Sequence, residues 1–324
     1  MSGSAIVLVV VEQHGGTLRA SATALLTAAR ALGEPQAVWF GAEPGADALA
    51  VLGAHGARVV HVVPGGDAAL PDAVAAGLAE LAASAGADVV LLASGFGAKE
   101  VAARLALATD AALMVDASAV ERGADGRVVT TQQAFAASWT LRSAALADRA
   151  VVTMRSNAVR AVPLETSVTP EVATVAALLP GDGRVRVVER TTRPTSDRPD
   201  VGEATVVVVG GRGTQGDFSP VEDLADALGA AVGATRDATD EGWMPHEAMV
   251  GQTGQTISPR LYVGAGVSGA IHHRGGMQAS GTIVAVNADP DAPIFEFADF
   301  GVVGDLFEVL PQAAAEIRRL RAEG

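Results

Sequence analysis

Short aliphatic runs and longer alanine-rich stretches alternate along residues 4–110 of the chain. The aliphatic runs have the length of buried strands, and the alanine-rich stretches have the length of helices. Alternation of this kind is typical of a parallel sheet with helices on its faces. We predict strands at Ile6–Val11, Ala37–Gly41, Arg58–Val63 and Asp88–Ala93, and helices at Ser21–Leu32, 46–54, 71–84 and 98–108.

Between residues 113 and 190 the pattern changes to short β-type segments that follow one another without long helical stretches. Turn sequences such as Gly123–Gly126 and Pro180–Gly183 separate them. We predict that these segments form an antiparallel extension, which closes the first domain. The segments are 113–120, 127–135, 149–155 and 184–191.

A polar stretch, Arg190–Val201, contains two Arg-Pro pairs and has no periodicity, so it is the best candidate for a linker. A length of 324 residues suits two ordinary domains. We place the boundary near residue 203, which gives a first domain at residues 1–203 and a second at residues 204–324.

Strand–loop–helix alternation resumes after this boundary. The fold class is therefore α/β, with two domains that each contain a mostly parallel sheet and flanking helices. The expected strands of the second domain are Thr205–Val209, Leu261–Val263, Thr282–Asn287 and Ile294–Ala298, and the expected helices are Pro220–Leu228, Ser268–Met277 and Asp305–Arg321.

Charge and cysteine content narrow the choice of functions. The chain carries 37 acidic and 23 basic side chains, a formal charge of −14. Nucleic acids and anionic membrane surfaces require a basic footprint, so neither is expected as a main partner. The absence of cysteine excludes disulfides, thiol catalysis and iron–sulfur ligation by this chain.

The start of the chain has no basic segment of the kind that opens a signal peptide, and the longest apolar runs are too short to cross a membrane. We therefore expect a soluble protein of the cytoplasm that does not insert into membranes.

The segment Gly211–Gly216 follows a predicted strand and has the spacing G-x-G-x-x-G. Glycines at this spacing let backbone N–H groups approach a pyrophosphate, so a nicotinamide-dependent oxidoreductase is one alternative. The acidic residue expected about 20 positions later would be Asp237, which does not end an apolar strand. A plain tight turn is the other interpretation of this segment.

Two further loops combine glycine with polar side chains. Thr235 and Arg236 follow Gly233, and a guanidinium can stack on a planar ring. Gln252 and Thr253 lie between two glycines and suit the edge of a heteroaromatic ring. In isolation, a solvated surface arginine would be the favoured interpretation of the first loop, and a polar turn would explain the second loop equally well.

The segment 268–277 begins with Ser268 and Gly269, which can receive a phosphate at a helix start. The adjacent His272 and His273 point in different directions on a helix, so no metal site is expected there. Asn287 ends a predicted strand, where ligands of open α/β sheets bind. Asp305 begins a predicted helix and could also be an ordinary N-cap.

The order and spacing of these segments together resemble the electron-transfer flavoprotein alpha subunit. The resemblance covers about residues 205–312, and the first domain agrees only in pattern. It implies an electron carrier without catalytic residues, which holds FAD in an extended pose in its second domain. The segments are G-G-R-G, G-A-T-R, V-G-Q-T-G, L-Y-V-G-A-G-V-S-G-A-I-H-H, V-A-V-N-A-D-P-D-A-P-I-F and A-D-F-G-V-V-G-D-L-F.

The resemblance assigns a role to each part of the site. Arg212 is expected near the phosphates or the ribityl chain, and the Arg236 guanidinium over the isoalloxazine ring. The Thr253 hydroxyl is expected near N5 and His273 near O2, where a reduced flavin gains negative charge. The implied FAD-binding residues are Arg212, Thr235, Arg236, Val250, Gly251, Gln252, Thr253, Ser268, Gly269, Ala270, Ile271, His272, His273, Asn287, Asp305 and Leu306.

Within this set, Ser268 to His273 are expected to wrap the pyrophosphate and the ring, and Asn287, Asp305 and Leu306 to contact the adenosine half. The first domain has no comparable motif, so we assign it to assembly with a beta subunit. Its single lysine, Lys99, is expected to form a structural ion pair.

The resemblance further implies a heterodimer that carries electrons from flavoprotein dehydrogenases, such as the acyl-CoA dehydrogenases of fatty acid beta-oxidation, to a membrane quinone oxidoreductase. These redox partners would bind transiently. Two alternatives remain open at this point: a nicotinamide-dependent oxidoreductase that uses the Gly211–Gly216 loop, and a flavin-free assembly subunit.

Overall fold

A computed structural model describes residues 5–64, 70–135, 137–175, 187–189, 191 and 197–323 of the chain. It divides into two compact units, which are described separately. Unit 1 comprises Met1–Gln133 and Thr140–Thr192, and unit 2 comprises Ala134–Trp139 and Arg193–Gly324. Within the described residues, no helix is long and apolar enough to cross a membrane.

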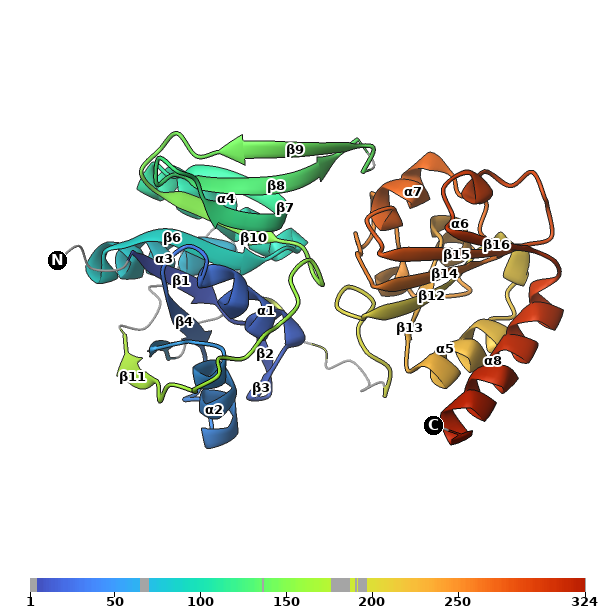
Figure 1. Ribbon diagram of the computed structural model, residues 1–324, viewed down its shortest axis with the longest axis horizontal. Helices are drawn as coiled ribbons and strands as arrows, with labels where there is room; N and C mark the ends of the chain where they lie inside the picture. The colour runs from blue at the N-terminus through green and yellow to red at the C-terminus, as the bar shows by residue number, and fades with distance from the viewer. Residues whose placement is uncertain are drawn as a thin grey trace. The chain divides into compact units, whose positions relative to one another are not determined.

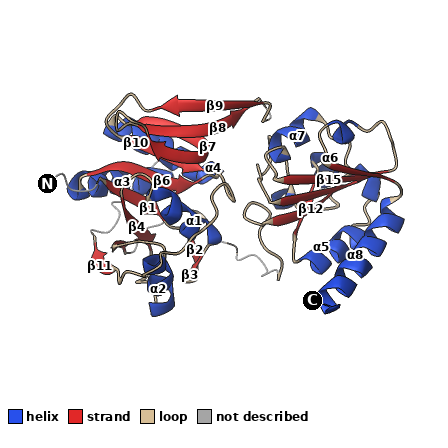
Figure 2. Ribbon diagram, in the orientation of Figure 1, coloured by secondary structure: helices blue, strands red, loops and turns tan. Residues whose placement is uncertain are grey.

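Unit 1 is built on a sheet with the strand order β11-β5-β4-β1-β6-β10-β7-β8-β9 (Figures 1 and 2). A small hairpin of β2 (Gln13–His14) and β3 (Thr17–Leu18) lies apart from this sheet. The strands of the main sheet are β1 Ile6–Val10, β4 Glu34–Phe40, β5 Val59–Val63, β6 Ala87–Ala93, β7 Ala112–Arg122, β8 Val128–Ala134, β9 Trp139–Ala144, β10 Ala150–Met154 and β11 Glu171–Thr174.

Two apolar clusters fill the two faces of this sheet. Leu26 of α1 and Leu52 of α2 pack in one cluster, and Leu78 of α3 and Leu105 of α4 pack in the other. The predicted strand–helix alternation is confirmed for residues 6–109, since aliphatic strands covered on both faces must be apolar throughout. The helices are α1 Ala20–Ala29, α2 Ala46–Ala54, α3 Pro71–Ala85 and α4 Phe96–Thr109.

The antiparallel extension is confirmed for β7 and β8, which pair from Ala117↔Gln132 to Arg122↔Val128. It is wrong for segment 149–155, because β10 lies between β6 and β7 and pairs in parallel with both. Every residue of β10 is buried, as a central strand of a parallel sheet requires. The sequence order alone favoured hairpins. Of the predicted segment 184–191, residues 184–186 and 190 lie outside the described residues, as does the turn Pro180–Gly183, and residues 187–189 and 191 are not in a strand.

Unit 2 contains a sheet with the order β13-β12-β14-β15-β16, in which all neighbouring pairs are parallel. Figure 1 shows α5 and α8 together on one face and α7 on the other. The elements are β12 Val206–Gly210, η1 Arg212–Thr214, α5 Ser219–Leu228, β13 Ala231–Ala234, α6 Arg236–Asp240, η2 His246–Ala248, β14 Leu261–Ala265, α7 Ile271–Met277, β15 Thr282–Asn287, η3 Pro293–Glu296, β16 Phe300–Val303 and α8 Leu306–Glu323.

Two expectations for unit 2 are wrong. The predicted strand Ile294–Ala298 is the 3₁₀ turn η3, because Pro293 starts a helical turn that buries Ile294 in the core, and the strand follows as β16. The predicted helix Ser268–Met277 begins only at Ile271, because Gly269 has a φ of +86°. Ser268 and Gly269 therefore belong to the turn before the helix.

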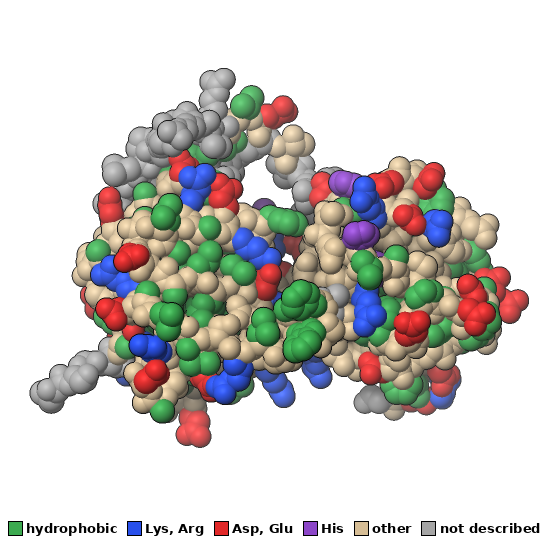
Figure 3. Space-filling model, turned by 90° about the horizontal axis from the view of Figure 1, so that it is seen from above, with side chains coloured by type: hydrophobic (Ala, Val, Ile, Leu, Met, Phe, Trp, Pro, Cys, Tyr) green, Lys and Arg blue, Asp and Glu red, His purple; other side chains and the backbone are tan. Residues whose placement is uncertain are grey.

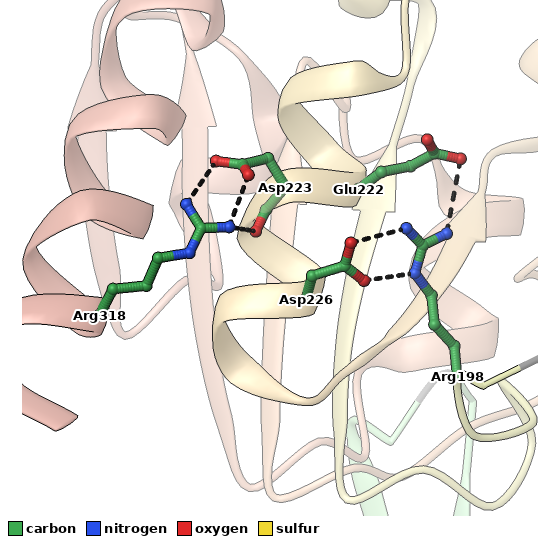
Figure 4. A network of polar contacts seen from close by, with 5 residues as sticks. All are labelled: Arg198, Glu222, Asp223, Asp226 and Arg318. Carbon is green, nitrogen blue, oxygen red and sulfur yellow. Dashed lines mark hydrogen bonds and ion pairs between the residues drawn. The ribbon is translucent and has the colours of Figure 1, made fainter. Parts of the chain in front are cut away.

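Ion pairs on α5 tie together three segments of unit 2 (Figure 4). The Arg318 guanidinium of α8 donates to Asp223 at 2.6 Å, and the Arg198 guanidinium donates to Asp226 at 2.7 Å. Exposed pairs of this kind contribute little energy each. They nevertheless show that the predicted linker Arg190–Val201 is held on unit 2 from Arg198 onward, whereas residues 190 and 192–196 lie outside the described residues.

Leu310 of α8 is 1% exposed and packs against α5 and the sheet, whereas Leu320 of the same helix is 54% exposed. We expect Leu310→Ala to lower the free energy of unfolding by about 2–5 kcal/mol, because it leaves a cavity in the core. Leu320→Ala is the matched control and should change it by less than about 0.5 kcal/mol. Urea denaturation measures both, and equal effects would contradict this assignment of the core.

Candidate functional site

All five strands of the unit 2 sheet run in the same direction, so their carboxyl ends meet at one edge. The chain leaves β12 toward β13 on one side and returns to β14 on the other side of β12. Ligands of open α/β sheets bind in the crevice at such a switch point. The loops after β12 and β14 therefore form the candidate ligand site.

The turns after β12 and β14 touch backbone to backbone. The N–H groups of Gly211 and Gly213 donate to the carbonyls of Ala265 and Gly266, both at 3.0 Å. A Cβ on Gly213 would lie 2.6 Å from the Gly266 Cα, so no side chain fits between the turns. The G-x-G-x-x-G spacing thus builds a close contact between two turns.

Arg212 extends from the turn after β12 and is exposed. Its guanidinium Nε lies 3.0 Å from a carboxylate oxygen of Asp237, the residue that the nicotinamide alternative requires for a ribose. Here that carboxylate pairs with an arginine.

Thr235 and Arg236 follow β13 at the same edge of the sheet. The Thr235 N–H donates to the Gly210 carbonyl at 3.0 Å, which ties this turn to the end of β12. The Thr235 hydroxyl oxygen is buried and has no hydrogen-bond partner among the described residues. Arg236 is exposed, and its Nε lies 3.2 Å from a carboxylate oxygen of Asp240.

The loop that carries Gln252 and Thr253 lies against α7. The Gln252 N–H donates to the His272 carbonyl at 2.9 Å, and the Gln252 side-chain oxygen lies 3.1 Å from His272 Nδ1. A Cβ on Gly276 would lie 2.5 Å from the Gly251 nitrogen, so α7 must have glycine there. The side chains of Gln252, Thr253 and His272 are exposed, as a ring-edge site requires.

His273 differs from its neighbour because its imidazole is buried. Its Nδ1 lies 2.9 Å from the Val250 carbonyl, and its Nε2 lies 2.7 Å from the Tyr262 hydroxyl. Burial lowers the pKa of His273 to about 4. Its predicted position beside the flavin O2 remains a prediction, and such a contact would require Nε2 to exchange its bond to Tyr262.

The residues expected at the adenosine half follow β15 and β16. The Asn287 amide donates to the Val267 carbonyl at 2.9 Å, and the Asp305 carboxylate accepts the Phe307 N–H at 2.9 Å. Asp305 thus caps α8, which was the second interpretation of this residue. The Leu306 side chain packs in the core next to Gly266.

The predicted residues therefore lie on loops and element ends at the carboxyl edge of one sheet. Five of them are buried: Val250, Gly251, Gly269, His273 and Leu306. Histidine and arginine side chains lie together on the surface of unit 2 in Figure 3. The sequence interpretation missed Tyr262, the partner of His273. The only tyrosine of the chain, placed in an aliphatic strand, was the available signal.

The site fits a flavin dinucleotide in two respects. The buried Thr235 hydroxyl has an unused hydrogen-bonding capacity at the switch point, which a ligand can satisfy. The glycines of the turns at Gly211–Gly213, Gly266 and Gly269 let these turns pack against neighbouring backbone at the carboxyl edge of the sheet, where backbone N–H groups can receive a pyrophosphate. Exposed arginines on two of the loops add positive charge in an otherwise acidic chain.

Comparisons with known proteins agree with this geometry. The model of the electron transfer flavoprotein FAD-binding domain matches residues 200–278, and that of the electron transfer flavoprotein domain matches residues 7–179. The chain is similar to electron transfer flavoprotein subunit alpha of Mycobacterium leprae (strain TN), with 45% identity over 317 residues that cover 96% of this chain and 98% of the relative. An FAD-binding match leaves no support for a nicotinamide-dependent enzyme or a flavin-free subunit.

Two further relatives carry the same description. Subunit alpha of Mycobacterium tuberculosis (strain ATCC 25618 / H37Rv) is 45% identical over 324 residues, with 96% of this chain and 98% of the relative covered. Subunit alpha of Paracoccus denitrificans is 38% identical over 324 residues, with 96% and 99% covered. The similarity therefore extends over both units.

The contact between α7 and the 250–255 loop can be tested at Gly276. We expect Gly276→Ala to lower the free energy of unfolding by about 1–3 kcal/mol, because the added methyl group overlaps the Gly251 backbone. The control is Gly97→Ala in α4, where a Cβ meets no atom within 4 Å, and it should be neutral or slightly stabilising. A neutral Gly276→Ala would show that α7 and the loop are not in close contact.

The burial of His273 predicts a pH dependence of stability. Its folded-state pKa, about 4, lies below its unfolded value. The stability that neutral His273 contributes to the fold is therefore fully present above about pH 6.5, and it is lost as the pH falls toward 4. Between pH 7.5 and 5, wild type should lose about 2 kcal/mol of unfolding free energy more than His273→Asn. His272→Asn, at the exposed neighbour, is the control and should follow wild type.

Proposed function

The chain belongs to the electron transfer flavoprotein alpha-subunit family and is an FAD-binding electron carrier, and from this premise we propose how its residues hold FAD and which partners it serves. The bound flavin supplies the capacity to accept and release electrons. The residues of unit 2 orient the flavin, exclude water from part of it and adjust its potential.

The proposed contacts follow the loops around the sheet edge. The Thr235 hydroxyl and the Arg236 guanidinium face the isoalloxazine ring, and Gln252 and Thr253 meet its edge. Ser268 to His273 surround the pyrophosphate and the ring, with Arg212 near the phosphates or the ribityl chain. Asn287, Asp305 and Leu306 contact the adenosine half. The observation that carries this proposal is the buried Thr235 hydroxyl, which has no partner among the described residues.

Arg236 is suited to an adjustable contact with the ring. Its side chain is 61% exposed, and its ion pair with Asp240 spans one helical turn. Such a surface pair contributes at most about 1 kcal/mol, so a flavin can replace the aspartate at little cost. The guanidinium remains charged at any relevant pH and favours negative charge on the reduced ring.

We assign unit 1 to assembly with a beta subunit. The relatives are described as alpha subunits, which supports a second subunit. Its Lys99 makes the expected ion pair, at 2.8 Å from Asp116. The heterodimer would act in the cytoplasm and carry electrons from flavoprotein dehydrogenases, such as those of fatty acid beta-oxidation, to a membrane quinone oxidoreductase.

The first experiment is an absorption spectrum of the chain purified with its beta subunit, with the released cofactor identified by chromatography. The proposal expects a yellow complex that contains a single FAD per heterodimer. A colourless complex that cannot be reconstituted with FAD would overturn it.

Arg236→Ala in this complex should lower the first reduction potential of the flavin by tens of millivolts, since about 59 mV corresponds to a tenfold change in a one-electron equilibrium. The physical reason is the loss of a positive charge that stabilises the reduced ring. Arg236→Lys should restore most of the potential, because the charge returns without the planar group. Arg319→Ala on α8 is the control, and potentials that are equal in all four proteins would remove Arg236 from the site.

A further inference from the structure

The helix α6 carries two carboxylates beside the arginines of the ligand edge. Asp237 Oδ2 lies 3.0 Å from the Nε of Arg212, which extends from the turn after β12. Three residues further along the helix, Asp240 Oδ2 lies 3.2 Å from the Nε of Arg236. Both arginines to which the proposed function gives a contact with FAD are therefore paired with acids of the same short helix.

The core of unit 2 holds α6 in this place. Ala238 and Thr239, which lie between the two acids, are buried, and Ala238 packs in the apolar cluster on one face of the sheet. The Thr239 N–H donates to the Thr235 carbonyl at 3.1 Å, so the helix continues directly from the turn after β13. Residues three apart lie on the same side of a helix, so Asp237 and Asp240 stand together on the exposed side of α6.

The two ion pairs can be exchanged for contacts with a ligand. More than half of each of the four side chains is exposed, and the closest approach in each pair is made by Nε of the guanidinium. Exposed pairs of this kind stabilise a protein little. A guanidinium whose charge is already paired nevertheless attracts a second anion less strongly than a free guanidinium does. The carboxylates of α6 therefore compete with an anionic ligand for Arg212 and Arg236.

This competition affects ligands of different size unequally. A small anion such as inorganic pyrophosphate binds through charged side chains and backbone N–H groups alone. A flavin dinucleotide also brings its rings and its ribityl chain to the other loops of the edge. The same few-fold loss of affinity therefore leaves the dinucleotide bound, whereas it keeps the site free of small anions.

We infer that Asp237 and Asp240 are specificity-determining residues: by pairing with Arg212 and Arg236, they lower the affinity of the ligand edge for small anions and reserve it for a ligand that also contacts the other loops. This inference rests on the proposed function, which names FAD as that ligand and places Arg212 near its phosphates or ribityl chain and Arg236 over its ring. The two carboxylates act through the arginines and not through a contact of their own with FAD.

Asparagine removes each negative charge at nearly constant size. In the complete heterodimer freed of FAD, we expect Asp237→Asn to tighten the binding of both FAD and inorganic pyrophosphate by about two- to fivefold, because Arg212 is the arginine nearer to the phosphates. Asp240→Asn should tighten FAD by a similar factor and leave pyrophosphate unchanged, because Arg236 is assigned to the ring. The fluorescence of FAD and titration calorimetry with pyrophosphate measure the two affinities.

Glu241→Gln provides the matched control, since Glu241 is exposed at the end of α6 and has no ion pair among the described residues. It should leave both affinities unchanged. A second control combines Asp237→Asn with Arg212→Gln. In the Arg212→Gln background, Asp237→Asn should no longer tighten pyrophosphate, because the guanidinium for which the carboxylate competes is gone.

Weaker binding of FAD by either aspartate variant would overturn the inference, because the carboxylates would then hold the arginines where FAD needs them. Equal tightening by Glu241→Gln would also overturn it, since the effect would then belong to total charge. Unchanged FAD affinity in Asp237→Asn or Asp240→Asn has the same consequence. If wild type fails to bind FAD, the proposed function is wrong, and the pyrophosphate titrations of the Asp237 and Arg212 variants still test the competition.

Discussion

The close contact between two glycine turns at the switch point of the unit 2 sheet is the constraint on which the site depends. Gly213 and Gly266 meet through their backbones, and neither can carry a side chain without separating the ends of β12 and β14. The switch point is where the strand order reverses, so it is also where this topology opens a crevice at that edge. The loops of Thr235 and Ser268 take their positions from these two turns.

Burial then decides which polar groups of the site can carry charge. Arg212 and Arg236 are exposed and pair with Asp237 and Asp240, and such pairs are weak enough for a ligand to replace. His273 is buried with both nitrogens bonded, so it is held neutral. The positive charge at this edge therefore comes from the arginines, and His273 contributes a neutral side chain that both of its hydrogen bonds hold in place.

The sequence was informative where an element depends on its own residues. Aliphatic runs such as Ile6–Val10 and Thr282–Asn287 identify strands, and Pro71 and Gly229 mark a helix start and a helix end. The sequence was uninformative where the structure of an element depends on residues that are distant in the chain. β10 is a central parallel strand because it pairs with both β6 and β7. The turn η3 stands where a strand was predicted, because Ile294 packs into the core.

The same distinction applies to the site. Motif order pointed to the loops that the sheet then brought to one edge, since parallel strands place their following turns together. The pairing of His273 with Tyr262 spans 11 positions and two different elements, and the pairing of Arg212 with Asp237 spans more. No local pattern encodes such contacts, because each depends on how distant parts of the chain fold together.

A buried polar group without a partner couples folding of unit 2 to its ligand. The Thr235 hydroxyl is in this position, and an unsatisfied buried group of this kind costs about 1–3 kcal/mol. The apolar clusters on both faces of the sheet offset that cost in the free chain. A ligand that hydrogen-bonds to the hydroxyl removes this free-energy cost. Because such a ligand binds only the folded unit, it must also stabilise that unit against unfolding. Thr235→Val would remove the unsatisfied hydroxyl and also the hydrogen bond that the ligand makes to it. The free chain should therefore become more stable, whereas its affinity for the ligand should fall.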